Sequence, residues 1–185
     1  MTKSVTSSPL LRNLFSSLGF TAVALASFAC WAYGGSWLRS ETTLYLACAA
    51  IFLCFGSLSL HPLVADVTSR SRFFVSFIFA FAGYACAWCL FWFWMHDKRG
   101  ELFGSLVGCL LMAALFRLFL KRPTSVFTGA AVLFFWHTAG YFGGEWLFDL
   151  LGGGRSSLAK MAWGLGYGLG FGIGLTACLR KGATC

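Results

Sequence analysis

Residues 163–174 read Trp-Gly-Leu-Gly-Tyr-Gly-Leu-Gly-Phe-Gly-Ile-Gly, with a glycine at every second position. On a helix, positions four apart lie on one face, so alternate glycines fall into two tracks on opposite sides. The two tracks are Gly164, Gly168 and Gly172, and Gly166, Gly170 and Gly174. Small residues in such tracks let helix backbones approach closely within a membrane. We therefore expect a helix over 158–179 that packs closely against a neighbour on each side.

The apolar segment just before it, residues 126–150, carries polar side chains at a regular spacing. His137, Tyr141, Glu145 and Asp149 are each four residues apart, and we call them the polar stripe. On a helix they cover roughly 120° of one face and climb about 18 Å. Ionisable groups deep in a membrane are costly and normally face a protein interior or a cavity, so the stripe is the candidate functional site. Gly140 and Gly144 lie on the neighbouring face and complement the glycine tracks.

The composition excludes an ordinary soluble domain. Hydrophobic residues make up 58%, charged residues only 11%, and the mean hydropathy is +0.76, whereas soluble domains carry about 25% charged residues. Six apolar runs are each long enough to cross roughly 30 Å of hydrocarbon. They cover roughly 14–38, 43–65, 73–95, 102–120, 126–150 and 158–179. We expect an all-α integral membrane protein with one bundle of six transmembrane helices over 14–180, between a short lead at 1–13 and a tail at 181–185.

The basic residues predict the orientation of the chain. On one side of the six runs only Asp66 opposes nine basic residues, so that side carries the whole net charge of +8. The nine are Lys3, Arg12, Arg70, Arg72, Arg117, Lys121, Arg122, Arg180 and Lys181. We expect both termini on the cytoplasmic side of a bacterial inner (plasma) membrane. Anionic lipid headgroups explain the basic charge, so no nucleic-acid partner is indicated.

The eight cysteines do not form a disulfide framework, because seven fall in apolar runs and Cys185 lies at the C-terminal end. Most are expected to act as small buried hydrophobes. Cys86 and Cys89 form a Cys-x-x-Cys pair at helical spacing and are a possible redox pair. A thiol oxidase would also need a second thiol pair in an outer loop, and those loops contain no cysteine.

Other chemistry has little support in the sequence. The three histidines, His61, His96 and His137, fall at three different depths, which disfavours a haem held by two of them. No metal site and no catalytic residue is assigned, and the cofactor is left unknown. A purely structural interpretation of the stripe also stands: Glu145 and Asp149 would then pair with Arg155 or Lys160, and His137 would hydrogen-bond a backbone carbonyl.

Two functional hypotheses from different classes follow. The first is a small transporter, permease or solute-binding component, in which His137 is the titratable group and Tyr141 bridges it to Glu145. The second is a non-catalytic subunit of a respiratory, photosynthetic or secretion complex. A third, weaker hypothesis is a lipid- or quinone-handling enzyme. Besides the lipid bilayer, the expected partners are further copies of the chain or other membrane subunits, contacted through the glycine-rich segment.

Overall fold

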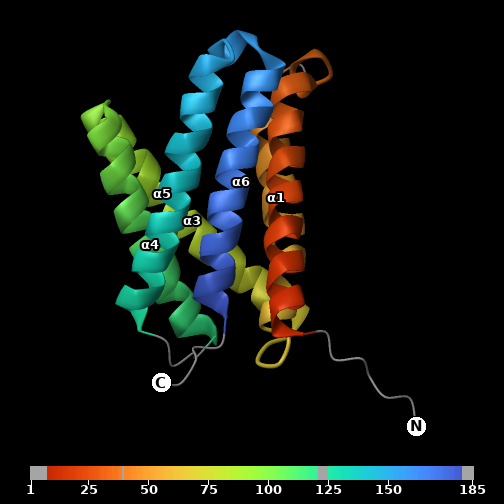
Figure 1. Cartoon of the computed structure of the whole chain (residues 1–185), viewed down its shortest axis with the longest axis vertical. Coiled ribbons are helices and arrows are strands. Elements are labelled where there is room, and N and C mark those ends of the chain that lie inside the picture. The colour runs from red at the N-terminus through yellow and green to blue at the C-terminus, as the bar shows by residue number, and fades with distance from the viewer. Residues whose placement is uncertain (1–7, 39, 121–124, 181–185) are drawn as a thin grey trace.

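The computed structural model describes residues 8–38, 40–120 and 125–180, and these residues are helical with no strand. Six long helices follow one another up and down the molecule (Figure 1). They are α1 (Pro9–Tyr33), α2 (Glu41–Leu60), α3 (Arg70–Met95), α4 (Lys98–Leu120), α5 (Val126–Leu150) and α6 (Ser157–Leu179). Three short 3₁₀ turns accompany them: η1 (Gly34–Ser36), η2 (His61–Leu63) and η3 (Gly153–Arg155).

The ends of the helices follow local sequence signals. α1 begins five residues before the predicted run because Ser8 accepts a hydrogen bond from the Leu11 N–H and Pro9 fits the first turn. α2 ends at Leu60, and the chain continues as the 3₁₀ turn η2, in which His61 keeps helical angles and Pro62, which lacks an N–H, lies in the first turn. His61 Nε2 lies 3.2 Å from the Thr68 carbonyl oxygen, so this histidine has a structural partner in the turn that follows.

Five of the six helices are long and apolar enough to cross a membrane, and α5 is not among them. α5 has 25 residues and covers the predicted range 126–150. It carries His137, Glu145, Asp149 and several glycines, which lower its hydropathy. The six expected segments therefore all form helices, but only five of these helices, among the described residues, are candidate membrane spans.

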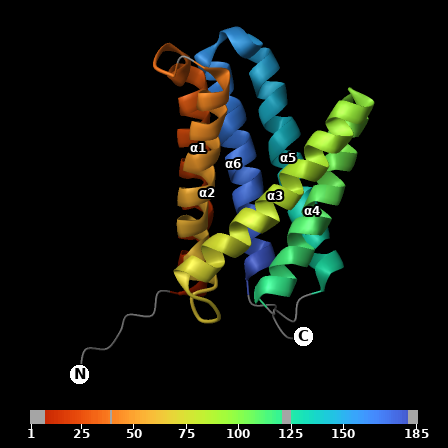
Figure 2. The same cartoon turned by 180° about the vertical axis from the view of Figure 1, so that it is seen from behind.

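α6 lies between α1 and α5, and α3 pairs with α4 (Figure 1). We call the end where α1 starts and α6 stops the proximal end, and the opposite end the distal end. Seen from behind, α3 begins beside α2 at the proximal end and runs diagonally away from it toward the distal end (Figure 2). The bundle is therefore closed proximally and splayed distally on this side.

The two glycine tracks of α6 face different neighbouring helices. Gly166 and Gly170 meet Gly140 and Gly144 of α5 so closely that a Cβ on Gly140 would lie 2.7 Å from the Gly170 Cα. The other track faces α1, where a Cβ on Gly168 would lie 2.8 Å from the Ala24 Cβ. The remaining contacts are Gly164 against Phe28, Gly172 against Ser17 and Gly174 against Leu133. Both tracks are thus filled by helices of the same chain, so a partner protein would need a different surface of α6.

Candidate functional site

His137 occupies the middle of α5 and is completely buried, with 0% of its surface exposed. Its Nε2 lies 2.6 Å from the hydroxyl oxygen of Tyr84, which comes from α3. The ring of Phe171 lies 4.8 Å from the imidazole and that of Tyr167 lies 5.7 Å away, measured between centroids. The histidine is therefore enclosed by aromatic side chains of α3 and α6.

Close helix packing brings these aromatic residues together. Tyr84 rests against Gly108 of α4, where a Cβ would lie 2.6 Å from the tyrosine Cδ2. The α5–α6 glycine contact likewise lets Tyr167 and Phe171 reach the imidazole from the neighbouring helix. These glycines therefore let the aromatic side chains meet around His137, because any larger residue would hold the helix backbones apart.

The partner of His137 differs from both sequence interpretations. Tyr141 was expected to bridge His137 to Glu145, but its ring stacks on the imidazole, with planes 20° apart and centroids 5.9 Å apart. Within the described residues, the hydrogen-bond partner of His137 is instead the Tyr84 hydroxyl, and no backbone carbonyl bonds to the imidazole. His137 Nδ1 has no hydrogen-bond partner within the described residues.

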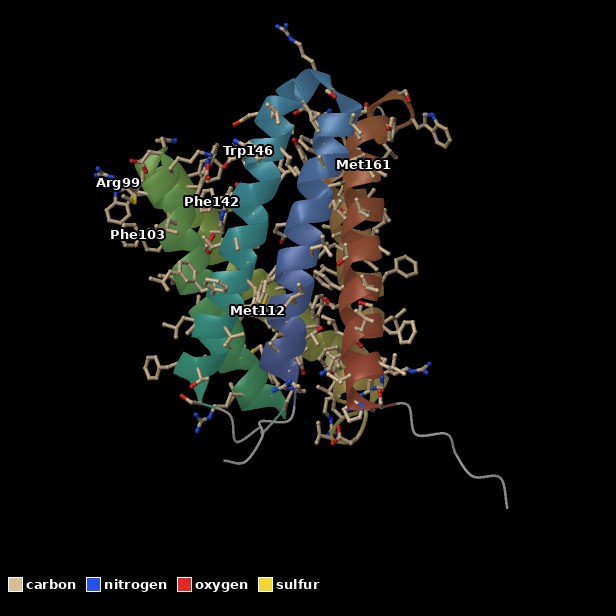
Figure 3. The ribbon with its side chains drawn as sticks, viewed as in Figure 1. Arg99, Phe103, Met112, Phe142, Trp146 and Met161 are labelled. Carbon is tan, nitrogen blue, oxygen red and sulfur yellow. The ribbon has the colours of Figure 1, made fainter. Side chains whose placement is uncertain are left out.

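The distal half of the polar stripe belongs to a separate ionic cluster. Glu145 pairs with Lys98 at the start of α4, and the same ammonium lies 3.3 Å from Glu101 Oε2. Lys98 also lies over the ring of Phe142, 5.8 Å from its centroid. In Figure 3, Phe142 lies on the side of α5 that faces α4, whereas Arg99 and Phe103 point away from α5. The cluster therefore joins α4 to α5 near the distal end.

The cations proposed from the sequence for the two acids lie elsewhere. Lys160 stands over the ring of Trp31, 4.7 Å from its centroid, and not against a stripe carboxylate. Asp149 is exposed one turn beyond Glu145. The four residues of the polar stripe thus divide into a buried pair, His137 and Tyr141, an ion-paired Glu145 and an exposed Asp149.

A groove of about 260 Å³ lies directly in front of the buried histidine. It is open on one side, and no residue of α2 lines it. Its walls come from α1, α3, α5 and α6 and are almost wholly aromatic. The lining residues are Phe28, Tyr84, Ala85, Trp88, Cys89, Tyr141, Trp163 and Tyr167. Three of them, Tyr84, Tyr141 and Tyr167, also contact His137, which forms a second layer behind the groove.

Two of the lining indoles carry an unused hydrogen-bond donor. The Nε1 atoms of Trp88 and Trp163 are both buried, and neither has a partner within the described residues. Buried indole N–H groups usually find an acceptor. Because these nitrogens have almost no accessible surface, neither donor faces the open volume of the groove.

The proximal side of the groove is sealed by apolar packing. Phe52 of α2 lies 4.7 Å from Phe81 and 6.1 Å from Tyr167, between ring centroids. Beyond this layer lie completely buried side chains, among them Phe20, Phe73, Phe77, Leu175 and Met112. Of these, Figure 3 labels Met112, between the helices. The structure thus shows a groove that ends in the middle of the bundle.

The remaining candidate residues take less prominent positions. Cys86 and Cys89 are free thiols exposed on α3, and Cys89 also borders the groove. Within the described ranges, no group of three or more His, Cys, Asp or Glu side chains could hold a metal ion. Sequence reasoning missed Tyr84, Trp88, Trp163 and Tyr167. Two of them had a signal in the sequence, because Tyr84 and Tyr167 each place a polar hydroxyl near the middle of an apolar run.

No protein-family model, curated protein or solved structure matches this chain. The functional argument therefore rests on the groove and the histidine behind it.

Proposed function

We propose that this chain is a six-span membrane protein that binds a small uncharged molecule in the groove, taken up sideways from the bilayer. The observation that carries this proposal is the aromatic groove itself, bounded by four helices and backed by the His137–Tyr84 hydrogen bond. Ligand sites are typically concave and apolar, with a few polar groups that fix orientation. The groove combines these features in the distal half of the bundle.

α5 is the sixth span in this proposal, although it is less apolar than the others. Its most polar residue at mid-length, His137, is completely buried, and Glu145 is paired with Lys98. Polar groups that face the protein interior cost much less than groups that face lipid. Its neighbours α4 and α6 are both candidate spans, which supports the same depth for α5.

The groove favours a solute-binding component over a conducting pore. A path across the bundle would have to pass the aromatic layer around Phe52 and Phe81, whose ring centroids lie 4.7 Å apart. Lateral entry requires no such path, because α3 diverges from α2 on the open side (Figure 2). The expected cytoplasmic location of both termini is part of this proposal. Two C-terminal fusions test it: a fluorescent protein should fluoresce if the C-terminus is cytoplasmic, whereas a phosphatase should be active only if the C-terminus lies on the outer side.

The experiment is to fill the groove without removing any polar group. Ala85 lines the groove on α3, so Ala85→Phe should occupy it, whereas Ala82→Phe adds the same ring at an exposed position of the same helix. Each protein is purified in mild detergent, and bound small molecules are identified by native mass spectrometry and solvent extraction. We expect wild type and Ala82→Phe to retain a specific small molecule that Ala85→Phe loses. Equal amounts of the same molecules on all three proteins would contradict the proposal.

A further inference from the structure

The distal part of the α1–α2 pair brings two thiols together, those of Cys30 and Cys48. One turn below Cys30 on α1, the Ser27 hydroxyl donates to the Cys48 carbonyl oxygen over 3.1 Å. In return, the Cys48 thiol donates to the Ser27 carbonyl oxygen over 3.4 Å. Each of these two side chains thus reaches the backbone of the opposite helix, so the two backbones lie close together at this level.

Cys30 lies at the same interface as Cys48. Positions three and seven apart share a helix face, so Ser27, Cys30 and Gly34 all lie on the side of α1 toward α2. A Cβ at Gly34 would lie 3.5 Å from the Cys30 Sγ and 2.9 Å from the Leu44 Cδ1 of α2. Leu44 is in turn four residues before Cys48 on α2. The two thiols are therefore placed between the same two helices, where their side chains interact directly.

The pair is open to reagents on the Cys30 side. Both cysteines are free thiols of intermediate exposure. Cys30 also lines a second pocket, of about 560 Å³, together with Tyr33, Ser36 and Trp37 from the end of α1 and the turn beyond it. A molecule that enters this pocket from the distal end can therefore contact the Cys30 side chain first.

The proposed orientation of the chain places this pair in the outer half of the membrane. With both termini cytoplasmic, the distal end of α1 faces the outer side, so the inference rests on that part of the proposed function. Disulfides persist on the oxidising outer side of a bacterial membrane and are rare in the cytoplasm. The compartment therefore favours oxidation of two thiols that already touch.

We infer that Cys30 and Cys48 form a disulfide that joins α1 to α2. The Cys30 thiolate attacks the disulfide of a thiol–disulfide exchange oxidant on the outer side and releases one thiol of that oxidant. Cys48 then attacks the mixed disulfide and releases the second thiol. The chain loses two protons and two electrons, and the oxidant's disulfide is reduced to two thiols. The new bond closes residues 30–48 into a loop that contains η1.

The test maps the thiols of the full chain in native membranes. Cells are quenched in acid, the denatured protein is treated with N-ethylmaleimide, and its tryptic peptides are analysed without reduction. We expect peptide 13–39, whose single cysteine is Cys30, to be linked to peptide 40–70, which holds Cys48 and Cys54. The link should persist in Cys54→Ser and be lost in Cys48→Ser.

Two further readouts accompany the peptide map. Cys178, near the proximal end of α6, should be alkylated in the same digest, because thiols on the cytoplasmic side stay reduced. A reductant should lower the thermal midpoint of the wild-type protein by about 5–10 °C, since the disulfide restrains the unfolded chain. Cys30→Ser is the control for this shift and should not respond to the reductant.

Recovery of both Cys30 and Cys48 as alkylated thiols in the wild-type protein would overturn the inference. A link that survives Cys48→Ser would overturn it as well, because Cys54 would then be the partner. The C-terminal fusions report the orientation separately, so a reduced pair in a protein with a cytoplasmic C-terminus counts against the disulfide alone. Ligand retention by wild type and Ala85→Phe tests the aromatic groove independently of any thiol.

Discussion

At the scale of single residues, the centre of the molecule is a hydrogen bond between two buried side chains. Tyr84 and His137 lie on separate helices, and their polar atoms are 2.6 Å apart in apolar surroundings. Interhelical hydrogen bonds in membranes contribute modestly, but leaving a buried group unpaired carries a further cost. Because His137 Nδ1 already lacks a partner, losing the Nε2 contact would leave the whole imidazole unsatisfied.

Tyr84→Phe should therefore lower the free energy of unfolding by about 1–2 kcal/mol. The substitution keeps the ring that packs on Gly108 and removes only the hydroxyl. Tyr45→Phe on the exposed face of α2 is the matched control and should have little effect. The measurement is denaturant unfolding in detergent micelles. Equal stability of the two variants would show that the hydrogen bond contributes nothing.

The sequence identifies only part of the site at this scale. His137 and Tyr141 are recognisable because polar side chains at four-residue spacing stand out in an apolar run. The sequence does not reveal that Tyr84 and Trp163 are neighbours of His137 and Tyr141. The spacing of residues along one helix carries no information about which residues of another helix they contact. The wrong partner for His137, Tyr141 in place of Tyr84, has this same cause.

At the scale of helices, α6 is held between α1 and α5 by its two glycine tracks. The α5 contact is close at Gly140, where a Cβ would lie 2.7 Å from the Gly170 Cα and 2.9 Å from the Gly170 nitrogen, and would also meet the Gly166 carbonyl oxygen. Real Cβ atoms do not approach backbone this closely, so any side chain there must push the helices apart. The pattern of alternate glycines predicts this packing, because it depends only on the residues of one helix and their size.

Gly140→Ala should consequently destabilise the α5–α6 pair, although alanine is the better helix former. Gly143→Ala is an ideal control on the same helix, since a Cβ at Gly143 meets nothing within 4 Å. We expect Gly143→Ala to be neutral or up to about 1 kcal/mol stabilising, and Gly140→Ala to lower the thermal midpoint clearly. A Gly140→Ala protein as stable as Gly143→Ala would mean that the two helices are not in close contact.

The helix ends show where sequence reasoning works and where it fails. α5 covers the expected residues 126–150, whereas α2 ends at Leu60, short of the expected residue 65, and gives way to the 3₁₀ turn η2. α1 was placed too late, because a hydropathy run begins at the first apolar stretch, whereas the helix begins at the Ser8 cap. Capping therefore matters more than hydropathy for this boundary.

At the scale of the whole molecule, a tightly packed proximal half supports a splayed distal half. The proximal half is filled by large aromatic and aliphatic side chains, whereas the distal half contains the groove and the Lys98 cluster. Lys98 pairs with two carboxylates, Glu145 from α5 and Glu101 from α4 itself. This cluster therefore links α4 to α5 at the distal end.

Lys98→Met should lower stability by about 1 kcal/mol, because it leaves two partly buried carboxylates without a cation. Adding Glu145→Gln should restore part of the loss, since it removes one of the uncompensated charges. Arg99→Met is the control, because Arg99 points away from α5 (Figure 3). Thermal unfolding in nanodiscs measures all four proteins. A double variant no more stable than Lys98→Met would show that the cluster does not join the helices.

The most direct measurement of the central claim, ligand binding in the aromatic groove, is photolabelling in native membranes. A decyl-tailed ring probe with a diazirine is irradiated with the protein, and peptide mass spectrometry locates the labelled residues. The account predicts labels concentrated on Trp88, Tyr141, Trp163 and Tyr167, and lost in Ala85→Phe. Labels spread over exposed lipid-facing side chains such as Phe15, Phe93 and Leu118, and unchanged by Ala85→Phe, would contradict it.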